Sequence, residues 1–189
     1  MTDLLPLRLS AGDTIGVIAP SDPVLPDQEN RLHMGIAYLT DMGFTVKIGA
    51  HIRSKALGYT ATPAEKAEDI NRMFADPDVR AIICAQGGDS ANAPLTLIDW
   101  DAIRQNPKVF MGLSDITVLL NAIYQQTGLV TFHGNDILWG FGNDLAEYER
   151  AEFIRTVLNG ELGPIPPNRP RVNVRAGQAS GKLLGGNLR

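Results

Sequence analysis

A strand, a turn and a helix follow one another in residues 108–124, KVFMGLSDITVLLNAIY. Residues 108–112 form a short apolar run, which predicts a strand. Apolar residues after the turn recur every three or four positions, the spacing of one helix face. Ser114 therefore lies on a turn between a predicted strand and a predicted helix. The helical positions are Ile116, Leu119, Leu120, Ile123 and Tyr124.

Short apolar runs and amphipathic segments also alternate on both sides of this unit. Strands that alternate with helices form βαβ units, whose right-handed crossovers give a parallel sheet with helices on both faces. The sequence therefore predicts an α/β fold with a doubly wound, mostly parallel sheet. The further strands are expected at 14–19, 44–48, 80–85 and 129–132, and the further helices at 28–42, 62–76, 92–98 and 146–158.

Length and charge exclude several classes of protein. The 189 residues suffice for one domain, or for one domain and part of another. With 17 Lys and Arg against 21 Asp and Glu, the net charge is −4, which argues against a nucleic-acid or anionic membrane partner. No apolar run approaches ~18 residues and no signal peptide is recognisable, so no transmembrane helix is expected.

Cysteine and histidine are scarce in this chain. Cys84 is the only cysteine, so no internal disulfide can form and a reducing, cytoplasmic location is expected. The three histidines lie far apart, without the spacing of zinc ligands. We therefore expect neither a metal nor another cofactor.

Four polar or glycine-rich loops directly follow predicted strands. They are residues 21–22, 86–90, 114–115 and 133–136. The carboxyl ends of parallel strands meet at one edge of a sheet, where ligands gather. We expect the functional site at this edge.

Ser114 is the first candidate for chemistry. A serine between a strand and a helix resembles a nucleophile elbow, in which the next backbone N–H, here that of Asp115, helps to stabilise an oxyanion. The match to G-x-S-x-G is incomplete, because Ile116 stands at the fifth position. The alternative is that Ser114 is a simple helix N-cap.

The loop 86–90, QGGDS, has three interpretations. Its glycines let the backbone approach a ligand, so one of its amides can be the second oxyanion donor. It can instead cradle a phosphate with its amides. The third interpretation is a tight connection without a ligand.

His133 is a candidate general base for Ser114, with Asp136 or Asp115 as the carboxylate that orients it. A hydrogen-bonded structural histidine at a strand end is the alternative.

Three other residues are interpreted as packing residues. Cys84 lies among apolar neighbours and is expected to be a small buried hydrophobic residue. Trp139 and Phe141 lie on an apolar loop, where we expect exposed aromatics that pack against a partner domain, a second subunit or a ligand.

Six short segments occur in a recognisable order. They are GDTIGVIAPS (12–21), GYTA (58–61), GGDSAN (87–92), GLSDIT (112–117), TFHG (131–134) and GGNL (185–188). In this order and approximate spacing, the chain resembles the LD-carboxypeptidase and microcin C immunity family of serine peptidases.

The resemblance implies a flavodoxin-like N-terminal domain, here residues 1–162. A Pro-rich linker and the start of an otherwise absent β-rich C-terminal domain would occupy 163–189. Ser114 matches the family's nucleophile, and the Asp115 and Gly88 amides match its oxyanion hole. The substrate-binding positions implied are Gly87, Asp89, Ser90, Asn92 and His133, of which the last is not the family's catalytic histidine.

The family's triad also needs a glutamate and a histidine, which follow the GGNL segment. Here the chain ends at Arg189, directly after that segment. We therefore expect the chain to be inactive alone, and an end at arginine suggests proteolysis or truncation.

The expected function is that of a serine carboxypeptidase, which cleaves an amide-type bond near a C-terminus through an acyl-enzyme at Ser114. Murein tetrapeptides or peptidyl- and aminoacyl-nucleotide conjugates are the implied substrates, and the segments 89–92 and 131–141 look more like the microcin-immunity branch. The implied partners are the missing C-terminal domain and a second copy of the chain in a homodimer. The alternative is a non-catalytic, flavodoxin-like module that binds a phosphate or nucleotide.

Overall fold

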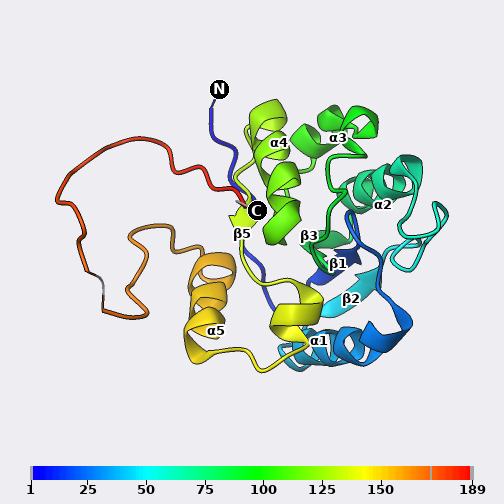
Figure 1. Ribbon diagram of the computed structural model, residues 1–189, viewed down its shortest axis with the longest axis horizontal. Coiled ribbons are helices and arrows are strands. Elements are labelled where there is room, and N and C mark those ends of the chain that lie inside the picture. The colour runs from blue at the N-terminus through cyan, green and yellow to red at the C-terminus, as the bar shows by residue number, and fades with distance from the viewer. Residues whose placement is uncertain (1, 171, 188–189) are drawn as a thin grey trace.

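The computed structural model describes residues 2–170 and 172–187. Five strands form one sheet in the order β2-β1-β3-β4-β5, and every pairing between them is parallel (Figure 1). This is the flavodoxin-like order, in which the winding reverses between β1 and β3. The predicted fold class is confirmed. The strands are β1 (Thr14–Ile18), β2 (Thr45–Ile48), β3 (Val79–Cys84), β4 (Val109–Gly112) and β5 (Phe132–His133).

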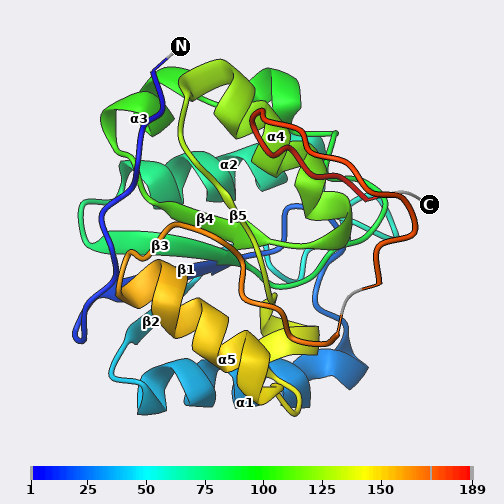
Figure 2. The same cartoon turned by 90° about the vertical axis from the view of Figure 1, so that its left-hand side faces the viewer.

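The helices cover the sheet in two layers (Figure 2). α2, α3 and α4 lie on one face, and α1 and α5 lie on the other. Successive residues of a strand point to opposite faces, so Ile82 and Cys84 join the core under α2–α4, whereas Ala81 and Ile83 join the core under α1 and α5. None of the helices in the described ranges is long and apolar enough to cross a membrane. Their bounds are α1 (Glu29–Asp41), α2 (Pro63–Ala75), α3 (Trp100–Gln105), α4 (Thr117–Thr127) and α5 (Glu147–Phe153).

The start of α2 shows why its sequence forms a helix at this point. Thr62 Oγ1 accepts a hydrogen bond from the Glu65 N–H at 3.2 Å, and Glu65 Oε2 accepts one from the Thr62 N–H at 2.7 Å. Pro63 occupies the first helical position, where no N–H is needed. The helix predicted at 62–76 is confirmed, and Thr62 and Glu65 form a capping box at its start.

The short helical stretch predicted at 92–98 is shorter in the structure and is not an α-helix. Only a 3-10 turn, η2 (Leu95–Leu97), forms there, and a helix that the apolar pattern missed, α3, follows it. The signal for α3 lies in Asp99, whose Oδ1 accepts a hydrogen bond from the Ala102 N–H at 2.9 Å. An aspartate N-cap of this kind fixes a helix start even where the apolar pattern is short.

The end of the sheet also differs from the sequence prediction. Leu129 forms only an isolated bridge to Leu4, and β5 begins later, at Phe132. The expected aromatic loop is instead a π-helical turn, η4 (Ile137–Phe141). Phe141 is buried and packs against Tyr38 and Phe153, so the prediction that it is exposed was wrong. Trp139 remains 51% exposed.

A second π-helical turn, η5 (Ile154–Leu158), follows α5. Beyond it, residues 159–170 and 172–187 contain neither helix nor strand. Part of this segment returns to α4, where Asn121 Nδ2 donates a hydrogen bond to the Gly185 carbonyl at 2.8 Å. The last residue of the GGNL segment lies outside the described residues, and the domain boundary after residue 162 stays a prediction.

Candidate active site

Ser114 lies on the turn that leaves β4 at the carboxyl edge of the sheet. Its φ is +58°, and within the described ranges it is the one non-glycine residue with a positive φ. This conformation strains an L-residue and is found at functional turns. Leu113 is the N-cap residue of the 3-10 turn η3 (Ser114–Ile116), and Ile116 is the N-cap residue of α4. Neither residue makes a side-chain capping hydrogen bond. The geometry is therefore that of an elbow, and the Ser114 side chain caps neither helix.

The residues on either side explain how this tight turn fits. A Cβ on Gly112 would lie 2.7 Å from the Cγ2 atom of Ile116 and 3.3 Å from the Cβ of Cys84. The strand end must therefore be glycine, because the buried Ile116 folds back over it. The isoleucine at the fifth position, which departs from G-x-S-x-G, is the residue that closes the turn.

The glycine loop after β3 packs directly against this elbow. A Cβ on Gly87 would lie 3.0 Å from the Cβ of Ser114 and 3.4 Å from the Asp115 nitrogen. Gly88 has a φ of +151°, and a Cβ there would lie 2.3 Å from the Asp22 carboxyl group. Of the described residues, none accepts a hydrogen bond from the Gly88 N–H through its backbone carbonyl. The structure thus brings Ser114 and the two glycines together at the edge expected from the sequence.

The Asp115 carboxylate joins the loops that follow β1, β3 and β4. Its Oδ2 atom accepts hydrogen bonds from Ser21 Oγ at 2.6 Å and from the Ala91 N–H at 2.8 Å. Ser21 is fully buried, and its Oγ also accepts a hydrogen bond from the Ser90 N–H at 3.2 Å. Asp115 is therefore engaged away from His133, and it does not orient that histidine.

Lys66 supports this cluster from α2 and was not anticipated from the sequence. Its side chain is only 1% exposed, and its Nζ donates a hydrogen bond to Ser90 Oγ at 2.7 Å. Burial lowers the pKa of the Lys66 ammonium, while the charges of Asp22 and Asp115 act in the opposite direction. The sequence did contain a signal, because Lys66, Ile70 and Met73 share the buried face of α2 at helical spacing.

The catalytic arrangement of Ser114, His133 and Asp136 is not assembled within the chain. His133 is exposed, and among residues 2–170 and 172–187 no hydrogen bond joins it to Ser114 or Asp136. Asp136 is fully buried, and its Oδ1 accepts hydrogen bonds from the N–H groups of Trp139 (2.8 Å) and Gly140 (3.2 Å). Its role is to cap η4.

The other predicted substrate-binding residues fall into two groups. Asp89, Asn92 and His133 are exposed, so a ligand at the carboxyl edge can reach their side chains. Ser90 instead directs its hydroxyl inward to Lys66 and to the Ser21 carbonyl. Its contribution to the site is therefore support, through the hydrogen bonds of its side chain.

Asp136 gives the fold a distinctive pH dependence. Burial raises its pKa to about 6, and its Oδ2 atom has no hydrogen-bond partner in the described part of the chain. The folded state then holds the proton more tightly than the unfolded state, so this residue's contribution to stability is complete below pH 4 and is lost as pH rises to 6.

We expect Asp136→Asn to be more stable than wild type by up to about 3 kcal/mol at pH 7, and to match it near pH 4. Urea unfolding across this range measures the difference.

The matched control is Asp99→Asn, the same exchange at an exposed helix N-cap. It carries no burial penalty, so it should lack the pH-dependent gain. Equal behaviour of the two variants at pH 7 would contradict the assignment to burial.

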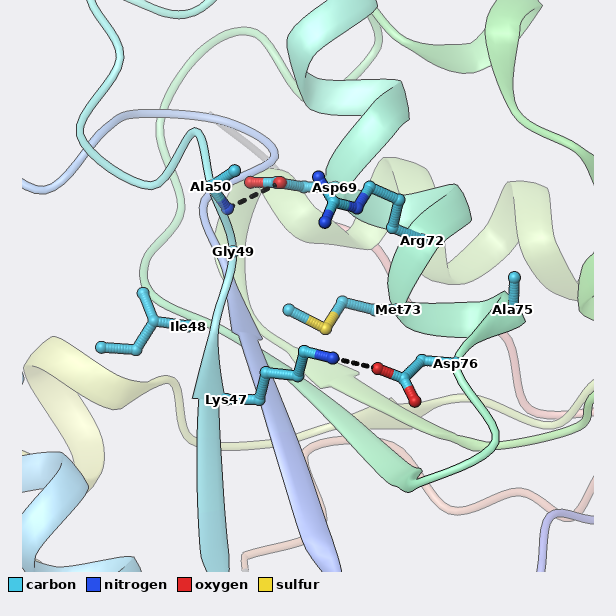
Figure 3. Close-up of a pocket in the computed structure, with 9 residues that line it drawn as sticks. All are labelled: Lys47, Ile48, Gly49, Ala50, Asp69, Arg72, Met73, Ala75 and Asp76. Carbon is cyan, nitrogen blue, oxygen red and sulfur yellow. Dashed lines mark hydrogen bonds and ion pairs between the residues drawn. The ribbon is translucent and has the colours of Figure 1, made fainter.

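A separate hollow of about 380 Å³ lies between β2 and α2 (Figure 3). Its charged groups are engaged with one another, with the backbone or, in the case of Arg72, with the Glu68 carboxylate. Lys47 pairs with Asp76, and Asp69 accepts hydrogen bonds from the N–H groups of Ala50 and His51, both at 2.9 Å. These contacts fasten α2 to the edge strand, and we assign no ligand to this hollow.

Comparisons with known proteins agree with the fold. Residues 15–134 match the LD-carboxypeptidase N-terminal domain. The chain is 38% identical to a probable murein peptide carboxypeptidase of Bacillus subtilis, over 97% of this chain and 57% of that protein. It is also 35% identical to the microcin C7 self-immunity protein MccF of Escherichia coli, over 85% of this chain and 47% of that protein.

Solved structures give the same result. MccF in its wild-type apo state superposes with a TM-score of 0.79 at 34% identity, covering 85% of this chain and 48% of that one. A muramoyltetrapeptide carboxypeptidase from Oxalobacter formigenes gives a TM-score of 0.66 at 28% identity, covering 76% of this chain and 47% of that one.

A doubly wound α/β fold with a strained serine at a strand–helix turn resembles in its geometry the nucleophile elbow of hydrolases. The chain belongs to the LD-carboxypeptidase family, of which it contains the N-terminal domain. It spans about half the length of the relatives it matches.

Proposed function

We propose that this chain is the nucleophile-bearing part of a serine carboxypeptidase. Residues 1–162 would form the domain that carries Ser114, and 163–189 would lead into a β-rich domain. The observation that carries the proposal is the φ of +58° at Ser114, with Gly87 packed against its side chain. A strained serine beside a glycine loop is what an exposed nucleophile with nearby amide donors requires.

In the proposed reaction, Ser114 Oγ attacks the carbonyl carbon of a bond near the substrate's C-terminus while a general base takes its proton. The Asp115 and Gly88 amides hold the resulting oxyanion. The intermediate collapses, the amine leaves with the proton from the base, and an ester to Ser114 remains. Water, deprotonated by the same base, then attacks the ester and releases the acid.

The base of this reaction is assigned to a histidine, held by a glutamate, in the part of the relatives that this chain does not cover. A serine hydroxyl without a base is a weak nucleophile. We therefore expect the full-length product of the gene to release the C-terminal residue of its substrate, and the 189-residue chain to be at least about 10³-fold slower. Chromatographic detection of the released residue measures both rates. A chain that works as fast as the full-length product would contradict the assignment of the base.

The relatives suggest which substrates to test. One is described as a murein peptide carboxypeptidase, and another confers self-immunity to microcin C7. We propose a peptide or a peptidyl- or aminoacyl-nucleotide as substrate, acted on in the cytoplasm by a homodimer. A murein tetrapeptide and an aminoacyl-sulfamoyl nucleoside distinguish the two branches.

The phosphate-binding alternative is disfavoured by charge. The carboxyl group of Asp22 lies against Gly88, and Asp89 follows directly in the chain. A doubly charged phosphate in the loop would meet these negative charges, which the single charge of Lys66 offsets only in part. Chemical-shift changes at residues 86–90 during a titration with inorganic phosphate, together with full function of Ser114→Ala, would favour the alternative.

A further inference from the structure

We infer that Lys66 is a positioning residue, which aligns the two proposed oxyanion donors through a partly buried chain of hydrogen bonds. The inference rests on the proposed function and names a residue outside the reacting groups. Its basis is the continuous path Lys66–Ser90–Ser21–Asp115, which leads from α2 to the elbow.

The path begins with a lysine that is almost completely buried. Lys66 Nζ donates to Ser90 Oγ at 2.7 Å and lies 3.5 Å from the Ser90 carbonyl oxygen. A buried ammonium is costly unless its protons are used and its charge is balanced. Here the balancing charges are the carboxylates of Asp22 and Asp115, which belong to the loops after β1 and β4.

From Ser90, the path crosses to the loop after β1. The Ser90 N–H donates to Ser21 Oγ at 3.2 Å, and Ser90 Oγ lies 3.4 Å from the Ser21 carbonyl oxygen. Thr60 Oγ1 donates to that same carbonyl at 2.9 Å. These contacts fix the residue that ends the glycine loop, because Ser90 is two positions after Gly88.

The path ends on the residue that follows the proposed nucleophile. Ser21 Oγ donates to Asp115 Oδ2 at 2.6 Å, and the Ala91 N–H donates to the same oxygen at 2.8 Å. The Asp115 side chain therefore ties the elbow to the far side of the glycine loop. The contacts that start at Lys66 therefore reach Ser90, two positions after the Gly88 amide, and Asp115, whose own amide is the second proposed donor.

The charge of Lys66 has a second consequence for the site. An oxyanion that forms beside Ser114 would lie near the Asp22 and Asp115 carboxylates, and their repulsion would oppose it. A buried cation behind these carboxylates offsets that repulsion. Removal of Lys66 should therefore affect the transition state more than the binding of a neutral substrate.

The test compares Lys66→Met with Lys108→Met. Lys108 is the matched control because it is also a buried lysine that donates to backbone carbonyls, those of Met73 and Asp76. It contacts the C-terminal end of α2, whereas Lys66 contacts the loop that carries Gly88. In the full-length protein, Lys66→Met should lower kcat at least about tenfold, while KM stays within about threefold of the wild-type value. Lys66→Arg keeps the positive charge and should retain at least about a third of the wild-type kcat. Lys108→Met should lose thermal stability and keep kcat.

A second readout does not depend on catalysis. In the ¹⁵N-labelled chain, the amide signals of Gly88 and Asp115 should shift in Lys66→Met and stay in place in Lys108→Met. If Lys66→Met does not fold, Ser90→Ala breaks the same path and should shift the same signals. Unmoved signals with unchanged kcat in a folded variant would overturn the inference, and so would an equal loss of kcat in Lys108→Met. If the wild-type protein turns over no substrate, the proposed function fails and the amide signals alone decide the role of Lys66.

Discussion

Ser114→Gly is expected to abolish turnover and to stabilise the fold at the same time. Loss of the hydroxyl removes the proposed nucleophile, so kcat/KM should fall by more than about 10⁴-fold. The backbone strain at a φ of +58° disappears with glycine, which should raise the free energy of unfolding by about 1 kcal/mol. Turnover by the full-length protein and urea unfolding of the chain measure the two effects.

Ser114→Ala separates the hydroxyl from the strain. Alanine lacks the nucleophile but keeps the Cβ atom, so it should lose the same activity without gaining stability. If glycine and alanine gave equal stabilities, the strain at this turn would be absent. Substantial activity in either variant would remove Ser114 from the reaction.

The second large effect is expected for Gly88→Ala. A Cβ at this position would lie 2.3 Å from Asp22 Oδ1 and 2.5 Å from Ser21 Oγ, and φ is +151°. Because Ser21 is fully buried and its hydroxyl is held by Ser90 and Asp115, the loop must move and carry the Gly88 amide away from Ser114. We expect kcat to fall at least about 10²-fold and stability to fall by about 3 kcal/mol.

Gly12→Ala is the control for Gly88→Ala. Gly12 also has a positive φ, +91°, but no heavy atom lies within 4 Å of the position of its Cβ. It should therefore lose about 1 kcal/mol of stability and no activity. Unchanged kcat in Gly88→Ala, with the variant folded, would exclude the Gly88 amide as a donor.

Much of this fold is predictable from the sequence because its signals are local. Apolar runs mark the strands, and Thr62, Pro63 and Glu65 mark the start of α2 before any tertiary contact forms. The misassigned elements depend on tertiary contacts instead. Phe141 looked like a loop aromatic, but it is buried because η4 folds Phe141 back against Tyr38 of α1.

The site divides in the same way. Ser114, Gly87 and Gly88 are recognisable in the sequence, because a serine or a glycine directly after a predicted strand indicates a candidate site without knowledge of tertiary contacts. Lys66 was not recognisable in this way, since its partner Ser90 is 24 residues away and only the folded chain joins them. The sequence signal for its burial was that Lys66 lies on the same apolar helix face as Ile70, where a lysine needs a buried partner.

The most direct test of the proposed nucleophile is the site of covalent modification. The full-length protein is treated with a fluorophosphonate, which forms a stable bond to activated serines, and the adduct is located by peptide mass spectrometry. We expect one adduct, on Ser114. Substrate should slow its formation, and the Ser114→Ala variant should not form it. An adduct on Ser21 or Ser90 instead, or undiminished turnover by a protein fully modified at Ser114, would contradict the account.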